Sequence, residues 1–232
     1  MPARAPTRLP RRSPAARCSA GLLLGRSLTA VAQLRARLGR AAPPREELIA
    51  RHVAGQSFVD IGCMWTIDGA LCFAAEDAGA ETVTGVDVMA PTAQFTAELD
   101  RRGSKVRFVQ GDLHEPATIA QIGRHDVVWC SGVLYHAPHP LLTLERLREL
   151  TGRTLLLATE TVAETPGRRN TCVIAPGRDE HPNAEPANGP AQGFGPWYWG
   201  ISPSALRTML ALSGFEVVEV HRTPFHVTVV AR

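Results

Sequence analysis

A regular alternation of short β-like runs and helical segments, from residue 46 to residue 160, limits the folds that are open to this chain. The runs that we predict as strands are 57–61, 82–86, 105–110, 126–130 and 154–158. The helices are expected at 46–52, 68–78, 91–102, 117–122 and 140–150. Because parallel strands need a crossover connection, usually a helix, this alternation predicts a parallel sheet with helices on both faces.

The end of the chain changes this pattern. Residues 202–213 form a predicted helix, with Ser and Pro in the N-cap and first positions. Two closing strands, 215–221 and 225–231, are separated by so few residues that they must be antiparallel. The expected fold is therefore α/β, a Rossmann-like, doubly wound and mostly parallel seven-stranded sheet with an antiparallel last strand.

Charge divides the chain into two parts. Residues 1–45 contain ten Arg and no acidic residue, whereas residues 46–232 contain 15 basic and 22 acidic residues and carry a net charge of −7. We interpret 1–45 as a basic leader with a short helix near 19–38, and 46–232 as the folded domain. Since a surface that binds a phosphate backbone is normally basic, the acidic domain disfavours a nucleic-acid substrate, unless the basic leader is the segment that contacts the nucleic acid.

The cysteines and the apolar runs indicate the compartment. The five cysteines are scattered and form no C-x-x-C pair, which favours a reducing, cytoplasmic environment. The twin arginines at 11 and 12 are followed by an apolar run that Arg26 soon interrupts, so we do not expect an export signal. No stretch approaches the roughly 20 apolar residues that span a bilayer, and no membrane association is predicted.

Polar and small residues follow the ends of the predicted strands, where an open α/β sheet binds its ligands. Gly62 follows the first strand and allows backbone to pass close to a ligand. Asp87 follows the second, at the spacing of a carboxylate that accepts both hydroxyls of a ribose. Asp112 follows the third, within reach of an adenine amino group, and residues 131–136 follow the fourth, where a reacting group would sit.

These four motifs, in this order over about residues 55–160, resemble those of class I S-adenosylmethionine-dependent methyltransferases. The resemblance implies that the cofactor is S-adenosylmethionine. The residues that it implies for the cofactor are Asp60, Gly62 and Cys63 at the methionyl part, Asp87 at the ribose, Asp112 and Leu113 around the adenine, and Ser131 at the fourth strand. Trp65 either covers the cofactor or only fills space on the first loop.

A closer local likeness concerns the fourth strand. The segment Ser-Gly-Val-Leu-Tyr-His at 131–136 is similar to one in tRNA wobble-uridine carboxymethyltransferases. By this likeness Tyr135 matches the tyrosine that helps bind the extra carboxylate of their cofactor. Those enzymes carry a sizeable N-terminal region for which this chain has only the arginine leader, and their basic carboxylate ligands have no clear match here. The same Leu-Tyr-His segment also occurs in methyltransferases of small molecules.

The candidate catalytic residues are Tyr135 and His136. His136 is either a general base that takes a proton from the acceptor or a shaper of the pocket floor. Methyl transfer is a direct displacement, so alignment of the reactants can suffice without a base. His139 lies three residues after His136, but no third ligand is evident, and no metal site is predicted. Glu160, at the end of the fifth strand, is either exposed or in contact with the acceptor.

Residues 161–200 form a long connection rich in Pro, Gly and Asn. A connection of this length in a compact domain is usually functional or disordered, and we predict that it folds over the acceptor site as a lid. Trp197 and Trp199 either pack in the core beneath the last helix or line that site together with Tyr135, since ligand pockets are mostly apolar with aromatic walls, and we expect at least one of them to face the acceptor. An acidic body with an aromatic lid favours a small apolar or cationic acceptor over tRNA.

One departure from the family pattern lies in the first loop. Met64 and Thr66 stand where the family usually has glycines. A β-branched residue does not easily adopt a positive φ, and its side chain crowds a ligand. Either the loop follows a different path, with Gly69 supplying the freedom, or cofactor affinity is reduced. Three functions follow: a methyltransferase of a small molecule, a tRNA-modifying (carboxy)methyltransferase, and a non-catalytic relative.

Overall fold

A computed structural model describes residues 43–174, 199–223 and 226–232. The strands are β1 (Ser57–Ile61), β2 (Thr82–Asp87), β3 (Arg107–Gln110), β4 (His125–Ser131), β5 (Thr151–Glu160), β6 (Cys172–Ile174), β7 (Trp199–Ile201), β8 (Val217–Arg222) and β9 (His226–Ala231). The helices are α2 (Arg45–Val53), α3 (Ala70–Asp77), α4 (Ala93–Arg102), α5 (Pro116–Ile122), α6 (Pro140–Leu150) and α7 (Pro203–Leu212). The expected helix near 19–38, Trp197 and most of the expected lid lie outside the described residues.

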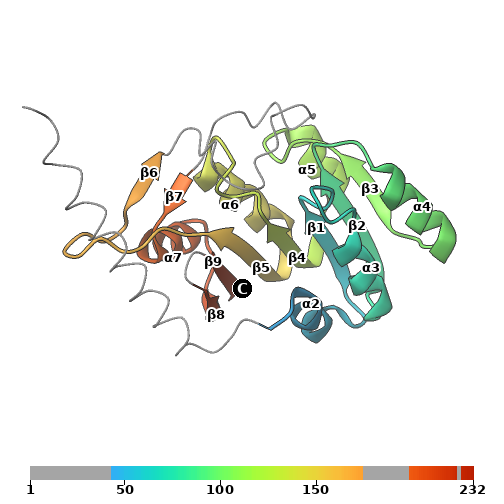
Figure 1. The fold of residues 1–232 in the computed structure, drawn as a ribbon, viewed down its shortest axis with the longest axis horizontal. Helices are drawn as coiled ribbons and strands as arrows, with labels where there is room; N and C mark the ends of the chain where they lie inside the picture. Colours follow the sequence, from blue (N-terminus) through green and yellow to red (C-terminus); the bar gives the residue numbers. More distant parts are fainter. Residues whose placement is uncertain (1–42, 175–198, 224–225) are drawn as a thin grey trace, which may run out of the picture.

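Seven of these strands form one sheet, in the order β3-β2-β1-β4-β5-β9-β8 (Figure 1). The first five pair in parallel, and β9 is antiparallel to both of its neighbours, β5 and β8. This confirms the predicted doubly wound fold with an antiparallel last strand. The chain order reverses between β1 and β4, which places the topological switch point at the carboxyl ends of these two strands.

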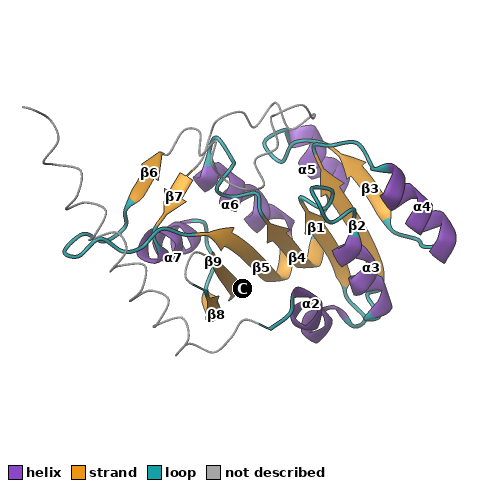
Figure 2. Ribbon diagram, viewed as in Figure 1, coloured by secondary structure: helices purple, strands orange, loops and turns teal. Residues whose placement is uncertain are grey.

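Helices cover both faces of the sheet (Figure 2). Helices α2, α3 and α4 pack on the face that carries Phe58 and Trp129, and α5, α6 and α7 pack on the face that carries Val59 and Cys130. Side chains alternate between the two faces along each strand, so the apolar strands of the sequence serve two cores at once. The face under α2 matters most for function, because Asp60 lies on it.

Local differences from the predicted elements have local causes. Helix α3 begins at Ala70, two residues later than predicted, because Asp68 and Gly69 have positive φ values of 45° and 72°. Thr92 caps α4 by accepting a hydrogen bond from the Phe95 amide, so Pro91 precedes this helix instead of lying in its first turn. The short antiparallel pair β6–β7 was not predicted.

Gly85 supports the packing beneath the site, and this gives a first prediction. A Cβ at Gly85 would lie 2.9 Å from the Cys63 Sγ and 3.1 Å from the Cys72 Sγ. We expect Gly85→Ala to lower the free energy of unfolding by about 1–3 kcal/mol, as overpacking of a core usually does. Urea denaturation measures this loss, and the double variant Gly85→Ala/Cys72→Ala should recover part of it. An unchanged midpoint for Gly85→Ala would show that the thiols move aside without cost.

Candidate functional site

The switch point brings the loops after β1 and β4 into close contact. Gly62 follows β1 with a φ of 82°, and its amide donates a hydrogen bond to the Val86 carbonyl at 2.8 Å. A Cβ on Gly62 would lie 2.6 Å from the Val133 Cγ2 and 3.3 Å from the Ser131 carbonyl oxygen. Any side chain at this position would therefore push the two loops apart, and only glycine also adopts this φ without strain.

The first loop carries Met64 and Thr66 at the two positions where glycines were expected. Met64 is 1% exposed and packs into the core under α3, so its side chain does not fill the carboxyl edge of the sheet. Thr66 takes the left-handed conformation, with a φ of 60°, which costs a β-branched residue roughly 1–2 kcal/mol. Trp65, between them, is 45% exposed.

Asp87 joins the first loop to the end of β2. Its Oδ2 accepts a hydrogen bond from the Met64 amide at 2.7 Å, and its Oδ1 accepts one from the Met89 amide at 2.9 Å. Burial raises the pKa of Asp87, and these backbone hydrogen bonds act in the opposite direction. The Val88 and Trp65 backbone amides also act on this carboxylate and lower its pKa, so backbone donors surround it at the end of β2.

Asp60 is a fully buried carboxyl group that is only partly satisfied by the described residues. Its side chain is fully buried on the α2 face; its Oδ2 is 3.7 Å from the Cys72 thiol, and its Oδ1 accepts no hydrogen bond within the part of the chain that the structure describes. Burial raises the pKa of Asp60 to about 7, and the charge of Asp87 acts in the same direction. An orphaned buried oxygen marks a site that a donor from a ligand can complete.

The remaining cofactor residues of the sequence prediction fall into two kinds. The side chains of Cys63 and Leu113 are buried in opposite cores, so only their backbone can face a ligand. Asp112 and Ser131 lie at the carboxyl ends of β3 and β4 with partly exposed side chains. The Asp112 Oδ1 accepts a hydrogen bond from the His114 amide at 2.8 Å, which fixes the carboxylate at the turn.

Tyr135 and His136 lie together just beyond β4. Their ring centroids are 4.3 Å apart, and the Tyr135 hydroxyl lies over Gly132, 3.8 Å from where a Cβ would be. Burial raises the pKa of Tyr135 to about 12, and the charge of Glu160 contributes to this rise. The phenol is therefore protonated at neutral pH and is a hydrogen-bond donor, not a base.

Of the two predicted acceptor tryptophans, the structure places Trp199. Its amide donates a hydrogen bond to the Tyr135 carbonyl at 2.8 Å, which holds β7 beside the loop after β4. Its indole Nε1 is buried and has no hydrogen-bond partner in the described regions. The backbones of Tyr135 and Trp199 are thus neighbours, and the Trp199 side chain packs against the core under α5, α6 and α7.

The site contains three residues that the sequence analysis did not assign to it. Glu160 ends β5 directly opposite His226, the first residue of β9, and the antiparallel pairing puts both side chains on the α2 face. Arg45 begins α2, and its charge acts on Asp60, Tyr135 and His226. The position of Glu160 at the end of a predicted strand was a signal in the sequence. No signal in the sequence pointed to the other two residues, because their positions depend on the pairing of β5 with β9 and on the direction of α2.

His226 is suited to accept a proton. Burial lowers its pKa, the positive charge of Arg45 lowers it further, and the charge of Glu160 opposes both. The imidazole is therefore neutral at pH 7 and has a ring nitrogen that can act as a base. The described residues contain no group of three or more His, Cys, Asp or Glu side chains that could hold a metal ion. Nor do they contain a helix long and apolar enough to cross a membrane.

Comparisons with known proteins agree with this geometry. A family model described as a methyltransferase domain matches residues 31–220. Among solved structures, the N-terminal domain of EvdMO1 with SAH bound has a TM-score of 0.62 and 19% identity, covering 84% of this chain and 82% of that one. An S-adenosylmethionine-dependent methyltransferase from Mesorhizobium loti has a TM-score of 0.54 and 16% identity, covering 82% and 96%.

A further solved structure shows the range of chemistry on this fold. The [4+2]-cyclase SpnF has a TM-score of 0.56 and 14% identity, covering 81% of this chain and 79% of that one. At such identities the likeness concerns the fold alone. A search of curated protein sequences finds no match to the chain.

Proposed function

Because this chain belongs to the methyltransferase-domain family, we propose that it transfers a methyl group from S-adenosylmethionine to a small-molecule acceptor. The observation that carries this proposal is the state of the two carboxylates on the neighbouring strands β1 and β2. Among the described residues Asp60 has a buried oxygen without a donor, and Asp87 accepts a hydrogen bond from the Met64 amide in the loop after β1. The two carboxylates match the ammonium and the ribose of an aminoacyl nucleoside.

The residues present fit this cofactor. Gly62 lets the loops after β1 and β4 meet at the carboxyl edge of the sheet, where a Cβ would collide with Val133. Residues that would hold the cofactor are Asp60 and Gly62 at the methionyl end, Asp87 at the ribose, and Asp112 with the Leu113 backbone at the adenine. Ser131 would flank it from β4, the Cys63 backbone would face it, and Trp65 would cover it. When bound, the cofactor supplies an electrophilic methyl group on a sulfonium.

The chain's own residues then orient the acceptor and take its proton. Tyr135, protonated at neutral pH, donates a hydrogen bond to the acceptor, and Trp199 forms an apolar wall with its indole N–H directed at a polar atom. His226 takes the proton from an acceptor hydroxyl or amine, and Glu160 opposite it stabilises the resulting imidazolium. His136, whose ring is tilted against that of Tyr135, shapes the floor of the pocket. We propose Tyr135, Trp197 and Trp199 as acceptor-binding residues.

Transfer of label from S-adenosylmethionine tests the function. We incubate the full chain with methyl-labelled cofactor and either a bacterial small-molecule extract or total tRNA, and measure label in each fraction by mass spectrometry. We expect label in the low-mass fraction, and a loss of at least about 100-fold for His226→Ala if the imidazole acts as base. Label found only in tRNA would replace this proposal by the tRNA-modifying alternative.

A further inference from the structure

A polar groove lies on the other side of β5 from the cofactor site. Its walls are the loop that follows β5, the first turns of α7 and the end of β8, and its volume is about 1050 Å³. The residues used in the argument are Glu164, Arg168, Arg169, Asn170, Arg207 and Arg222. The loop leaves β5 at Glu160, and β8 ends at Arg222, so the groove opens at the carboxyl edge of the sheet.

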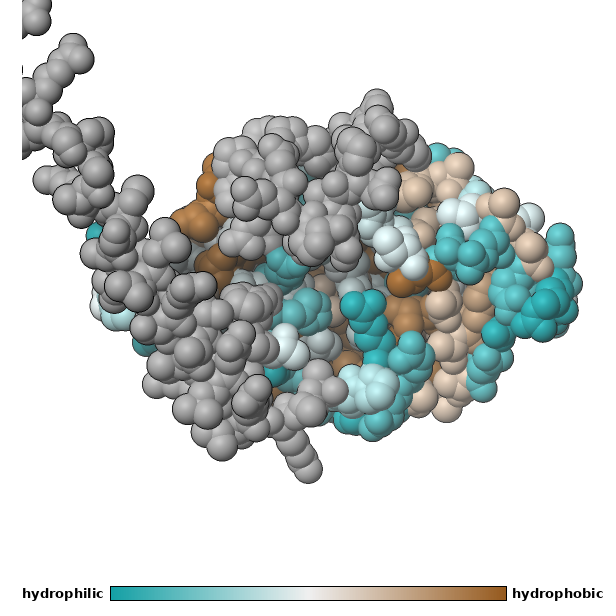
Figure 3. Space-filling view, in the orientation of Figure 1, coloured by the Kyte–Doolittle hydropathy of each residue, from teal (hydrophilic) through white to brown (hydrophobic). Residues whose placement is uncertain are grey.

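The groove is strongly basic in a domain that is acidic as a whole. Arg168, Arg169, Arg207 and Arg222 are all exposed, and none of them forms an ion pair within the described ranges. Other exposed arginines do form such pairs: Arg101 pairs with Glu98 on α4, where Figure 3 shows hydrophilic residues gathered. Four unpaired guanidinium groups around one hollow are an arrangement that attracts an anion.

Glu164, the one acidic residue among the described residues that line the groove, is hydrogen-bonded to the start of α7. Glu164 accepts hydrogen bonds from the Ser204 amide and from the Ser204 hydroxyl, the latter at 2.9 Å, and so occupies the N-terminus of α7. Its carboxylate therefore stabilises the helix end and forms no ion pair with the arginines, which outnumber it four to one in the described lining. This contact also ties the loop after β5 to α7.

Further hydrogen bonds hold the loop that carries two of the arginines. The Asn170 amide donates to the Ser204 hydroxyl at 2.7 Å, and the Thr208 hydroxyl donates to the Asn170 Oδ1 at 3.0 Å. The Thr171 amide donates to the Ser202 hydroxyl at 3.2 Å. The backbone that presents Arg168 and Arg169 is thus fixed against the helix that presents Arg207, which reduces the entropy lost on binding a ligand.

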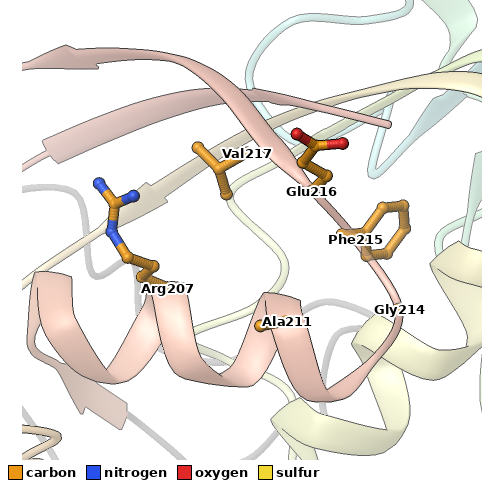
Figure 4. Close-up of a pocket in the computed structure, with 6 residues that line it drawn as sticks. All are labelled: Arg207, Ala211, Gly214, Phe215, Glu216 and Val217. Carbon is orange, nitrogen blue, oxygen red and sulfur yellow. The ribbon is translucent and has the colours of Figure 1, made fainter.

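A neighbouring hollow shows that the other end of α7 is different. It is lined by Arg207, Ala211, Gly214, Phe215, Glu216 and Val217, and Figure 4 shows Val217 between the guanidinium of Arg207 and the carboxylate of Glu216. This hollow contains one basic and one acidic side chain and no nucleophile. The excess of positive charge is therefore specific to the groove at the start of α7.

We propose that this groove binds the phosphate group of a phosphorylated small molecule. Guanidinium groups match phosphate oxygens with two parallel hydrogen bonds, and arginine is the residue most suited to this recognition. The volume is close to that of ordinary small-molecule sites, whereas the net charge of −7 over residues 46–232 disfavours a long polyanion. The proposal does not depend on methyl transfer, because it concerns a separate set of residues.

Binding of inorganic pyrophosphate tests this site directly. We titrate it calorimetrically into the full chain, into Arg207→Gln/Arg222→Gln, and into Arg101→Gln, the last being a matched control for loss of an exposed arginine elsewhere. We expect a loss of affinity of at least about tenfold in the double variant and no change in the control. Arg207→Lys/Arg222→Lys should bind pyrophosphate more tightly than the glutamine variant but more weakly than the wild type, because lysine keeps the positive charge but lacks the paired N–H donors of a guanidinium group.

Further titrations serve two purposes. One tests whether the double variant has also damaged the cofactor site, and the others test whether the groove prefers the free ion or a phosphorylated organic molecule. S-adenosylhomocysteine affinity should be equal in the wild type and the double variant, so a failed cofactor site and a failed phosphate site give different results. Inorganic phosphate and adenosine diphosphate, titrated at the same ionic strength, distinguish the free ion from a phosphorylated organic ligand. No pyrophosphate binding by the wild type, or equal binding by all variants, would overturn the proposal. Tighter binding of an RNA oligonucleotide through the same arginines would also overturn it.

Discussion

Replacing Asp87 with alanine is expected to weaken the binding of S-adenosylhomocysteine by about 100-fold or more. Two hydrogen bonds to an ionised carboxylate, each contributing about 1.5–3 kcal/mol, are lost with the ribose contact. At about 1.4 kcal/mol per factor of ten, the loss amounts to two or more orders of magnitude in Kd. The same change removes the acceptor of the Met64 amide, which loosens the first loop and adds to the effect. Isothermal titration of both proteins measures the difference.

This experiment needs a control for the loss of a carboxylate that holds backbone. Asp126 provides it, because its Oδ2 accepts hydrogen bonds from the Ser57 amide at 3.0 Å and the Ser57 hydroxyl at 2.7 Å, at the opposite edge of the sheet. We expect Asp126→Ala to lower the thermal midpoint but to leave the Kd of the folded protein within a factor of about three. Equal affinity in the wild type and Asp87→Ala would remove Asp87 from the cofactor site.

Binding of S-adenosylhomocysteine should tighten as the pH rises from 6 to 8 and then level off. Burial raises the pKa of Asp60 to about 7, so its carboxyl is mostly protonated at pH 6 and ionised at pH 8. The ligand ammonium favours the ionised form, so binding releases a proton below pH 7, and affinity changes by up to about tenfold across this range. Calorimetry in two buffers of different ionisation enthalpy measures both the affinity and the proton released.

Asp60→Asn supplies the matched comparison. The amide keeps the shape of the carboxyl but does not ionise, so we expect weaker binding that is independent of pH and no proton release attributable to this residue. Without ligand, the free energy of unfolding changes with pH in the opposite direction to the affinity. The pKa of Asp60 in the folded protein lies above the unfolded value of 3.8, so the stability contributed by protonated Asp60 declines as the pH rises toward 7. Wild-type binding without proton release at pH 6 would show that the ammonium does not contact Asp60.

Much of the site could be predicted because its residues occupy places fixed by strand ends. Gly62, Asp87 and Asp112 each follow a strand, and the pairing of β1 with β2 and β4 brings these ends together. The outcome for Met64 could not be read in the same way. Whether its side chain enters the cofactor edge or the core depends on the φ values at Thr66 and Asp68, which the residue types alone disfavour.

The alternation of strands and helices, the order of the motifs and the antiparallel closing pair could all be read from the order of residues, because hydrophobic periodicity and short connections act locally along the chain. Three other features depend on how distant elements pack: Glu160 faces His226, Arg45 reaches the same edge, and four arginines share one groove. These neighbours come from separate elements, and their proximity depends on strand register and helix packing, which no local stretch of residues encodes.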